Sequence, residues 1–185
     1  MKNNFNKCVI ALIILFACFN TGFAATIDDF VDMSYTNPIT KTVMKYRLFI
    51  PKNYDKTKQY PMVGFLHGAG QVDSNNITQI TANNGALFWA ADSIQKKYPS
   101  FILAPNSNGS EGYWGTAFWG DGNFLQESYE LSESLENYIN IINELKNKYS
   151  LDTNRLYSTG LSMGGAGTWA SLTRFPNMFA AAIPI

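Results

Sequence analysis

The chain has 185 residues, with 14 basic and 14 acidic side chains and one histidine, so its formal charge at neutral pH is zero. No block of basic residues interrupts this balance, so the composition does not support nucleic-acid binding or attachment to an anionic membrane surface. Aromatic residues make up 15% of the chain, which favours a packed globular domain.

The first 24 residues have the pattern of a secretory signal peptide. Two lysines precede an apolar stretch, residues 8–19, that is short for a membrane span, and Gly22 and Ala24 are small residues of the kind that a signal peptidase reads. The sequence therefore predicts a secreted or periplasmic protein with no stable membrane association after cleavage. An uncleaved membrane anchor is the alternative, and lipid attachment at Cys18 ranks below simple cleavage.

Both cysteines, Cys8 and Cys18, lie inside this signal segment. The mature chain, residues 25–185, is therefore expected to contain no disulfide and to depend on its hydrophobic core. A chain of about 160 residues is long enough for one domain.

Strand and helix patterns alternate along residues 25–185. Residues 43–49 alternate as in a partly exposed strand, whereas residues 62–68 and 100–105 are apolar runs typical of strands buried on both faces. Asn83 is a candidate cap for a helix that continues to Lys97. The remaining predicted elements are an amphipathic helix over 131–149, a strand over 155–160, a helix over 163–174 and a strand from residue 179.

This order of elements predicts an α/β fold with a mostly parallel sheet and helices on both faces. The alternating N-terminal segment is expected to add antiparallel strands at one edge.

The sequence GLSMGGAG, residues 160–167, lies between a predicted strand and a predicted helix. Gly-x-Ser-x-Gly in this context is typical of a nucleophile on a tight, strained turn, where neighbouring residues must be small so that the strand and the helix can approach. Ser162 is therefore the candidate nucleophile, and Gly160, Gly164 and Gly165 are its structural neighbours.

A second motif, FLHGAG, ends the first buried strand. Acyl transfer needs two backbone N–H donors for the developing oxyanion. The N–H of Met163, directly after the serine, is one candidate. For the other, Ala69 is the first choice and Gly68 the second.

His67, the single histidine, is expected to hold this loop by hydrogen bonding, and its use as the general base is the less favoured alternative. In this architecture the acid and the base follow the serine along the chain, yet residues 163–185 contain no Asp, Glu or His.

Three segments, residues 46–70, 97–106 and 151–185, together resemble secreted α/β-hydrolases, in particular the group of predicted peptidases, polyhydroxybutyrate depolymerase-like proteins, and feruloyl and acetylxylan esterases. The resemblance implies an α/β-hydrolase fold in which Ser162 is the nucleophile and Met163 with Ala69 or Gly68 forms the oxyanion hole. Members of the group continue with further strands that supply the acid and the histidine. We therefore expect residues 25–185 to be the N-terminal portion of one α/β-hydrolase domain, with its C-terminal strands missing.

A loop over residues 106–124 is rich in glycine and aromatic residues. Tyr113, Trp114 and Trp119 are candidates for lining a cleft for a sugar or an aromatic acyl group, and a hydrophobic lid on the sheet is an equal alternative. The glycosylation sequons at Asn76 and Asn108 are interpreted as chance matches.

The function expected from these features is hydrolysis of a carboxylic ester, either of a small molecule or of a polysaccharide, through an acyl-enzyme, without a metal or another cofactor. The alternatives are a serine peptidase of the prolyl oligopeptidase superfamily and a non-catalytic binding protein on the same scaffold. Without the acid and the base, the 185 residues by themselves are expected to be inactive.

Overall fold

The computed structural model describes residues 24–107, 114 and 131–185. Residues 1–23 of the predicted signal peptide, the sequon at Asn108 and the aromatic candidates Tyr113 and Trp119 lie outside the described residues. Within these ranges, no helix has the length and apolar character needed to cross a bilayer.

Six strands form one sheet in the order β1-β2-β4-β3-β5-β6. Strand β3 is parallel to β4 and β5, and β5 is parallel to β6, whereas β1 and β2 are antiparallel at one edge. The strands are β1 (Phe30–Thr36), β2 (Val43–Phe49), β3 (Tyr60–Leu66), β4 (Phe101–Pro105), β5 (Leu151–Gly160) and β6 (Ala181–Pro184). The predicted mostly parallel sheet with antiparallel edge strands is confirmed.

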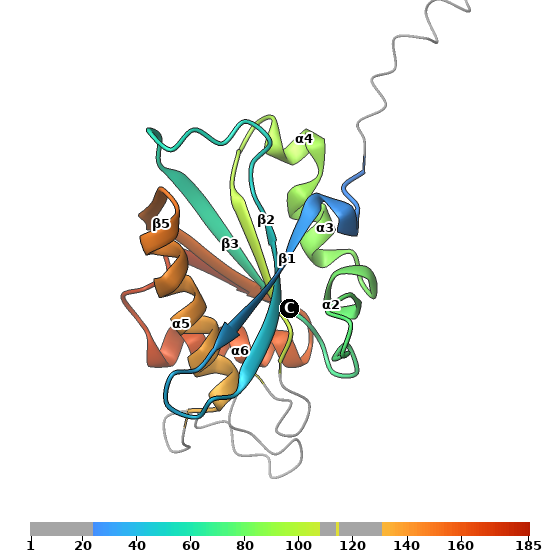
Figure 1. Cartoon of the computed structure of the whole chain (residues 1–185), viewed down its shortest axis with the longest axis vertical. Coiled ribbons are helices and arrows are strands. Elements are labelled where there is room, and N and C mark those ends of the chain that lie inside the picture. The colour runs from blue at the N-terminus through green and yellow to red at the C-terminus, as the bar shows by residue number, and fades with distance from the viewer. Residues whose placement is uncertain (1–23, 108–113, 115–130) are drawn as a thin grey trace, which may run out of the picture.

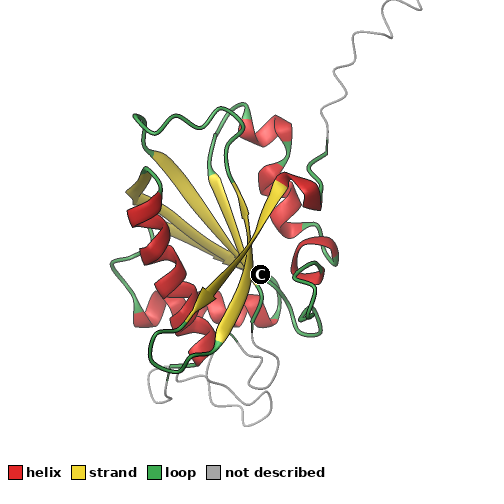
Figure 2. Cartoon of the chain, viewed as in Figure 1, coloured by secondary structure: helices red, strands yellow, loops and turns green. Residues whose placement is uncertain are grey.

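Helices cover both faces of this sheet (Figures 1 and 2). Helices α5 (Glu133–Lys148) and α6 (Met163–Arg174) lie on one face. The short helices α2 (Thr78–Thr81), α3 (Gly85–Ala90) and α4 (Asp92–Gln95) lie on the other, and a 3-10 turn, η1 (Ile27–Asp29), precedes β1. The predicted helices over 131–149 and 163–174 correspond to α5 and α6, whereas the four-residue helix α2 was not predicted.

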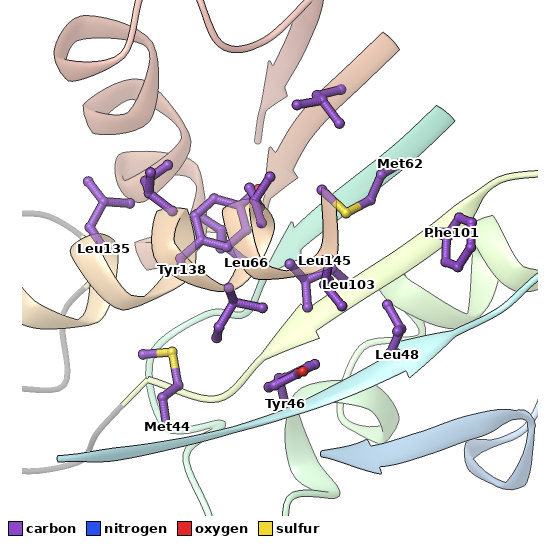
Figure 3. Close-up of a cluster of buried hydrophobic side chains, with 14 of the residues drawn as sticks. Met44, Tyr46, Leu48, Met62, Leu66, Phe101, Leu103, Leu135, Tyr138 and Leu145 are labelled. Carbon is purple, nitrogen blue, oxygen red and sulfur yellow. The ribbon is translucent and has the colours of Figure 1, made fainter. Parts of the chain in front are cut away.

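The period-two pattern of the strands divides the core into two clusters. Met62 and Leu66 of β3 point towards α5 and α6, whereas Val63 and Phe65 point towards α2 and α3. Strand β4 divides in the same way, so the apolar runs in the sequence are strands buried on both faces. Figure 3 shows the cluster on the α5 side, where Tyr138 and Leu145 of α5 pack over the strands.

The helix predicted from Asn83 to Lys97 is wrong as a continuous element, because Ala91 has an extended conformation (φ −58°, ψ 139°) that separates α3 from α4. The side chain of Gln95 compensates for the break: its Nε2 donates to the Trp89 carbonyl (2.8 Å) and its Oε1 accepts from the Ser100 amide (3.1 Å). The Asn83 side chain still accepts from the first helical amide, that of Gly85 (2.8 Å). A periodic pattern cannot reveal this break, because both helices continue the same apolar stripe.

Gly64 lies in the middle of β3 because Tyr138 packs directly onto it. A Cβ atom added to Gly64 would lie 1.9 Å from the Tyr138 hydroxyl oxygen and 2.8 Å from the ring carbon that bears it. Tyr138 is fully buried, and its hydroxyl is 3.3 Å from that of Ser158 on β5. The absence of a side chain at Gly64 therefore sets the distance between α5 and the centre of the sheet.

We predict that Gly64→Ala lowers the free energy of unfolding by about 2–3 kcal/mol, because the added methyl group overlaps a buried ring. In a Tyr138→Phe background the same substitution is expected to cost less, since the atom at 1.9 Å is then absent. Urea denaturation of the four proteins of this double-mutant cycle measures the coupling. Equal costs in both backgrounds would contradict this account of the packing.

Candidate functional site

Ser162 lies on an exposed, strained turn between β5 and α6. Its backbone angles, φ 55° and ψ −115°, belong to a region that non-glycine residues rarely occupy. Such a conformation costs about 1–3 kcal/mol and persists only where the surrounding structure enforces it. The turn therefore presents the hydroxyl of Ser162 to solvent beyond the carboxyl end of β5.

Backbone hydrogen bonds from two neighbouring strands enforce this turn. The amide of Leu161 donates to the Leu66 carbonyl of β3 (3.2 Å), and the amide of Ser162 donates to the Ile185 carbonyl (2.7 Å). The amide of Ile185 in turn donates to the Gly160 carbonyl (2.9 Å). The turn is thus held between the ends of β3 and β6.

The three glycines around Ser162 lie where backbones approach most closely. A Cβ on Gly164 would lie 1.9 Å from the Leu66 carbonyl oxygen, and one on Gly160 would lie 2.3 Å from the carbonyl oxygen of Gly164. One on Gly165 would lie 2.4 Å from the Ile185 carbonyl oxygen. Because all of these neighbours are backbone atoms, the chain can pass from β5 into α6 in this way only with glycine at these three positions.

The FLHGAG loop lies beside the serine. A Cβ on Gly68 would be 3.8 Å from Cβ of Ser162 and 3.3 Å from the Leu161 carbonyl oxygen. The turn after β3 and the turn after β5 therefore meet at the same edge of the sheet, close enough to bind one small chemical group between them.

His67 is fully buried, and its hydrogen bonds determine its tautomer. Nδ1 is 2.8 Å from the Gly68 carbonyl oxygen and must carry the proton, because a carbonyl only accepts. Nε2 accepts from the Ser107 amide (3.1 Å) and so is unprotonated. With both ring nitrogens engaged in the core, His67 is not placed to take a proton from Ser162.

Burial lowers the pKa of His67 below its ordinary value of 6.5, although the Gly68 hydrogen bond and the charge of Asp73 act in the opposite direction. The neutral ring is also the form that the hydrogen bonds require, because a protonated Nε2 would face the Ser107 N–H.

The two peptide groups around Gly68 are held from different sides. The His67 carbonyl accepts from the indole nitrogen of Trp114 (2.9 Å), and the Gly68 amide donates to Oε1 of Gln71 (2.9 Å). The Gly68 carbonyl is held by the His67 ring. Because the next peptide bond is trans, the N–H of Ala69 points away from the buried His67 ring.

The backbone amides of Ala69 and Met163, which flank Ser162 in the two turns, have no acceptor within the described residues. Met163 is the first residue of α6, whose twelve residues give its N-terminus a partial positive charge. The amide of Gly68, in contrast, is already bonded to Gln71. The geometry therefore favours Ala69 over Gly68 as a donor to a negatively charged ligand.

Of the two equal alternatives for Trp114, lining a substrate cleft or packing on the sheet, the structure agrees with packing on the sheet. Its side chain is fully buried and belongs to the core cluster on the α5 side of the sheet. Its ring packs edge-on against His67, with 5.0 Å between ring centroids, and its Cβ lies where a side chain on Gly167 would be. Trp114 therefore packs against the loop after β3 from the core on the α5 side of the sheet.

Sequence reasoning missed two polar residues of this site. Ser107 is buried and orients the ring of His67, and Gln71 holds the amide of Gly68. Neither has a signal in the sequence, because single polar residues in loops are common and only the folded chain shows their partners.

Asn76 of the first sequon is fully buried. Its Nδ2 donates to the Asp32 carboxylate (2.7 Å) and to the Tyr46 carbonyl (3.0 Å). A glycan on this nitrogen would require these bonds to break, so the folded chain cannot carry one there.

An open cavity of about 1030 Å³ lies at the other end of the sheet. Aromatic side chains such as Tyr60, Trp89 and Tyr157 line it, together with Ala181 to Ile183 of β6. None of its lining residues belongs to the Ser162 turn or to the loop after β3.

Within the described ranges, no group of three His, Cys, Asp or Glu side chains is placed to hold a metal ion.

We predict that His67 makes the stability of the chain depend on pH below neutrality. Because its pKa is lowered on folding, the unfolded chain binds the proton more readily, so stability is complete above pH 6.5 and falls as the pH drops through and below that value. Melting temperatures between pH 7.5 and 5 should fall more steeply for the wild type than for His67→Asn. Parallel curves for the two proteins would contradict this role of the ring.

Comparisons with known proteins agree with this architecture. The model of the prolyl oligopeptidase family matches residues 100–185. The crystal structure of a thermostable esterase has 42% sequence identity to the chain and a TM-score of 0.78, covering 85% of this chain and 41% of that one.

Two feruloyl esterases share the fold at lower identity. One is a serine-to-alanine variant of the module from Clostridium thermocellum, complexed with sinapinate (17% identity, TM-score 0.61, 84% of this chain and 52% of that one). The other is the ferulic acid esterase of Anaeromyces mucronatus in complex with ferulic acid (21% identity, TM-score 0.54, 81% of this chain and 54% of that one).

The chain thus spans about half, or less, of the length of these structures. Its strand order, the turn at Ser162 and these matches together show that it has the α/β-hydrolase fold and resembles the esterases of that fold over the part it shares with them.

Proposed function

We propose that this chain is the nucleophile-bearing part of a serine hydrolase that cleaves carboxylic esters. The observation that carries the proposal is that the exposed, strained Ser162 lies next to the FLHGAG loop. A Cβ atom added to Gly68 of this loop would be only 3.8 Å from Cβ of Ser162. The 42% identity to a thermostable esterase supports ester hydrolysis as the reaction.

In the first step, Oγ of Ser162 attacks the ester carbonyl carbon and a general base takes the hydroxyl proton. The tetrahedral intermediate collapses, the C–O bond to the alcohol breaks, and the alcohol leaves with the proton. Water then attacks the acyl-enzyme in the same manner, which releases the carboxylic acid and restores Ser162.

The amides of Met163 and Ala69 are the proposed oxyanion donors. Both lack an acceptor within the described residues, and they come from the two turns that meet at the site. Donors that are already fixed in place stabilise the developing charge without reorganising during the reaction, and one such donor contributes about 100- to 1000-fold to kcat.

The general base has to come from residues other than His67, since both nitrogens of its ring are engaged in the core. No Asp, Glu or His occurs between residues 163 and 185. We therefore propose that the acid and the base belong to a part of the natural protein outside these 185 residues, and that this stretch alone does not turn over esters.

For the substrate we propose an ester on a polysaccharide or a small aromatic ester. Feruloyl esterases with the same fold bind sinapinate and ferulic acid, and the predicted export of the protein, to the medium or the periplasm, would bring it to such material. Tyr113 and Trp119 remain candidates for contacts with the substrate.

A serine peptidase is the second candidate, because the prolyl oligopeptidase family model matches residues 100–185. The two reactions use the same nucleophile and oxyanion hole, and they differ in the leaving group that must be protonated. A non-catalytic binding protein is the third, and a natural protein lacking an acid and a histidine after Ser162 would favour it.

We predict that the natural full-length protein hydrolyses p-nitrophenyl acetate or methyl ferulate, and that Ser162→Ala removes at least about 1000-fold of kcat, because no other group can form the acyl-enzyme. Steady-state rates on these esters and on a peptidyl p-nitroanilide measure the reaction and its preference.

Ser93→Ala is the matched control, since Ser93 is exposed on α4 and away from the turn. Its activity should equal that of the wild type. Preferential cleavage of the anilide would favour the peptidase, and activity that survives Ser162→Ala would exclude Ser162 as the nucleophile.

A further inference from the structure

We propose that Gln71 is a positioning residue for the oxyanion hole: its side-chain oxygen holds the Gly68 amide, and this fixes the peptide that presents Ala69. The inference rests on the proposed function, because it assigns a role within that site. Gln71 does not touch the reacting atoms in this proposal; it acts through the backbone of the loop.

Two donors converge on the side-chain oxygen of Gln71. The amide of Gly68 donates to Oε1 at 2.9 Å, and Nδ2 of Asn83 donates to the same oxygen at 2.8 Å. Two donors on one atom settle which end of the amide is the oxygen. The side chain therefore has one orientation, in which the acceptor faces the loop.

Asn83 ties this contact to the adjacent helix. Its Oδ1 accepts from the amide of Gly85 (2.8 Å), the first residue of α3, while its Nδ2 binds Gln71. Gly85 itself is packed against the ring of Phe65 on β3, where an added Cβ would lie 2.1 Å from a ring carbon. Gln71 belongs to the same loop as Gly68, but its side-chain oxygen is anchored through Asn83 to α3, outside that loop.

This contact completes the fixing of Gly68. The peptide group between His67 and Gly68 is held at its carbonyl by Trp114 and at its N–H by Gln71. The following peptide group is held at its carbonyl by the ring of His67, which leaves only the Ala69 N–H unbound within the described residues. Both planes are therefore fixed before a substrate arrives, which is the condition for electrostatic stabilisation of a transition state.

Gln71 also determines which amide is available. By accepting from Gly68, it removes the second candidate donor and leaves Ala69 as the one that faces outward. A variant without this acceptor frees the Gly68 amide and lets the first peptide plane rotate, so the Ala69 N–H is no longer held in one direction.

The test compares Gln71→Met with Gln71→Glu in the natural full-length protein. Methionine has nearly the same length but no strong acceptor, whereas glutamate keeps an oxygen for both donors. We expect kcat on p-nitrophenyl acetate to fall roughly 10- to 100-fold in Gln71→Met, less than the loss of a whole oxyanion donor. KM should change less than about twofold, and Gln71→Glu should recover most of the lost kcat.

A transition-state analogue separates positioning from a general loss of structure. Phenylboronic acid adds to the serine and places an oxygen in the oxyanion hole, so its inhibition constant should rise in Gln71→Met in proportion to the fall in kcat/KM. Gln95→Met is the matched control, because the Gln95 side chain also accepts from a backbone amide, that of Ser100 before β4, and donates to the Trp89 carbonyl, away from the Ser162 site. It is expected to lower the melting temperature without changing kcat or the boronate constant.

Asn83→Asp provides a second variant if Gln71→Met does not fold. An aspartate still accepts from Gly85, but it repels Oε1 of Gln71 and turns the amide so that its NH₂ faces the Gly68 amide, and kcat should fall in the same way. The proposal is overturned if Gln71→Met keeps kcat within about twofold, if its boronate constant is unchanged, or if Gln71→Glu is no better than Gln71→Met. A wild-type protein that hydrolyses no ester would instead refute the proposed function.

Discussion

The close approach of α6 to the end of β3 is the constraint on which the rest of the site depends. The Leu66 carbonyl lies so near to Gly164 that any side chain there would overlap it, and the same carbonyl accepts from the amide of Leu161. This contact forces the chain to turn sharply at Ser162 and brings the N-terminus of α6 beside the loop that follows β3. The nucleophile and the loop meet because two backbones touch.

The strain at Ser162 is supported by the packing on either side of it. A residue at φ 55° and ψ −115° would relax in an isolated peptide, but here its amide is bonded to Ile185 and its neighbours lie against β3. The exposed hydroxyl is therefore attached to a backbone that is fixed by hydrogen bonds and packing. Rigidity of this kind suits a nucleophile, because the reaction is slower when the attacking atom first has to be moved into position.

The loop after β3 is rigid for a different reason. Its peptide groups are held by three side chains: the His67 ring and the Gln71 amide from the loop itself, and the indole of Trp114 from a distant segment. The buried histidine is neutral, and its two nitrogens act in opposite senses, one as a donor to the loop and one as an acceptor from Ser107. The residue that first suggests a catalytic base is thus a structural support whose protonation would disrupt its own hydrogen bonds.

The sequence by itself determined the layers of the fold and the position of the serine turn. Continuous apolar runs identify strands buried on both faces, and glycines spaced around a serine between a strand and a helix indicate the turn, because these signals arise from local geometry and burial. Only the tertiary structure decided that Ala69 rather than Gly68 has a free amide, that Trp114 belongs to the core and that the helix after Asn83 breaks at Ala91. Each of these outcomes depends on one side chain that meets a particular backbone group, across 47 residues for Trp114 and His67 but only five for Gln95 and Ser100. Single contacts of this kind leave no periodic trace in the sequence, whatever their separation along the chain.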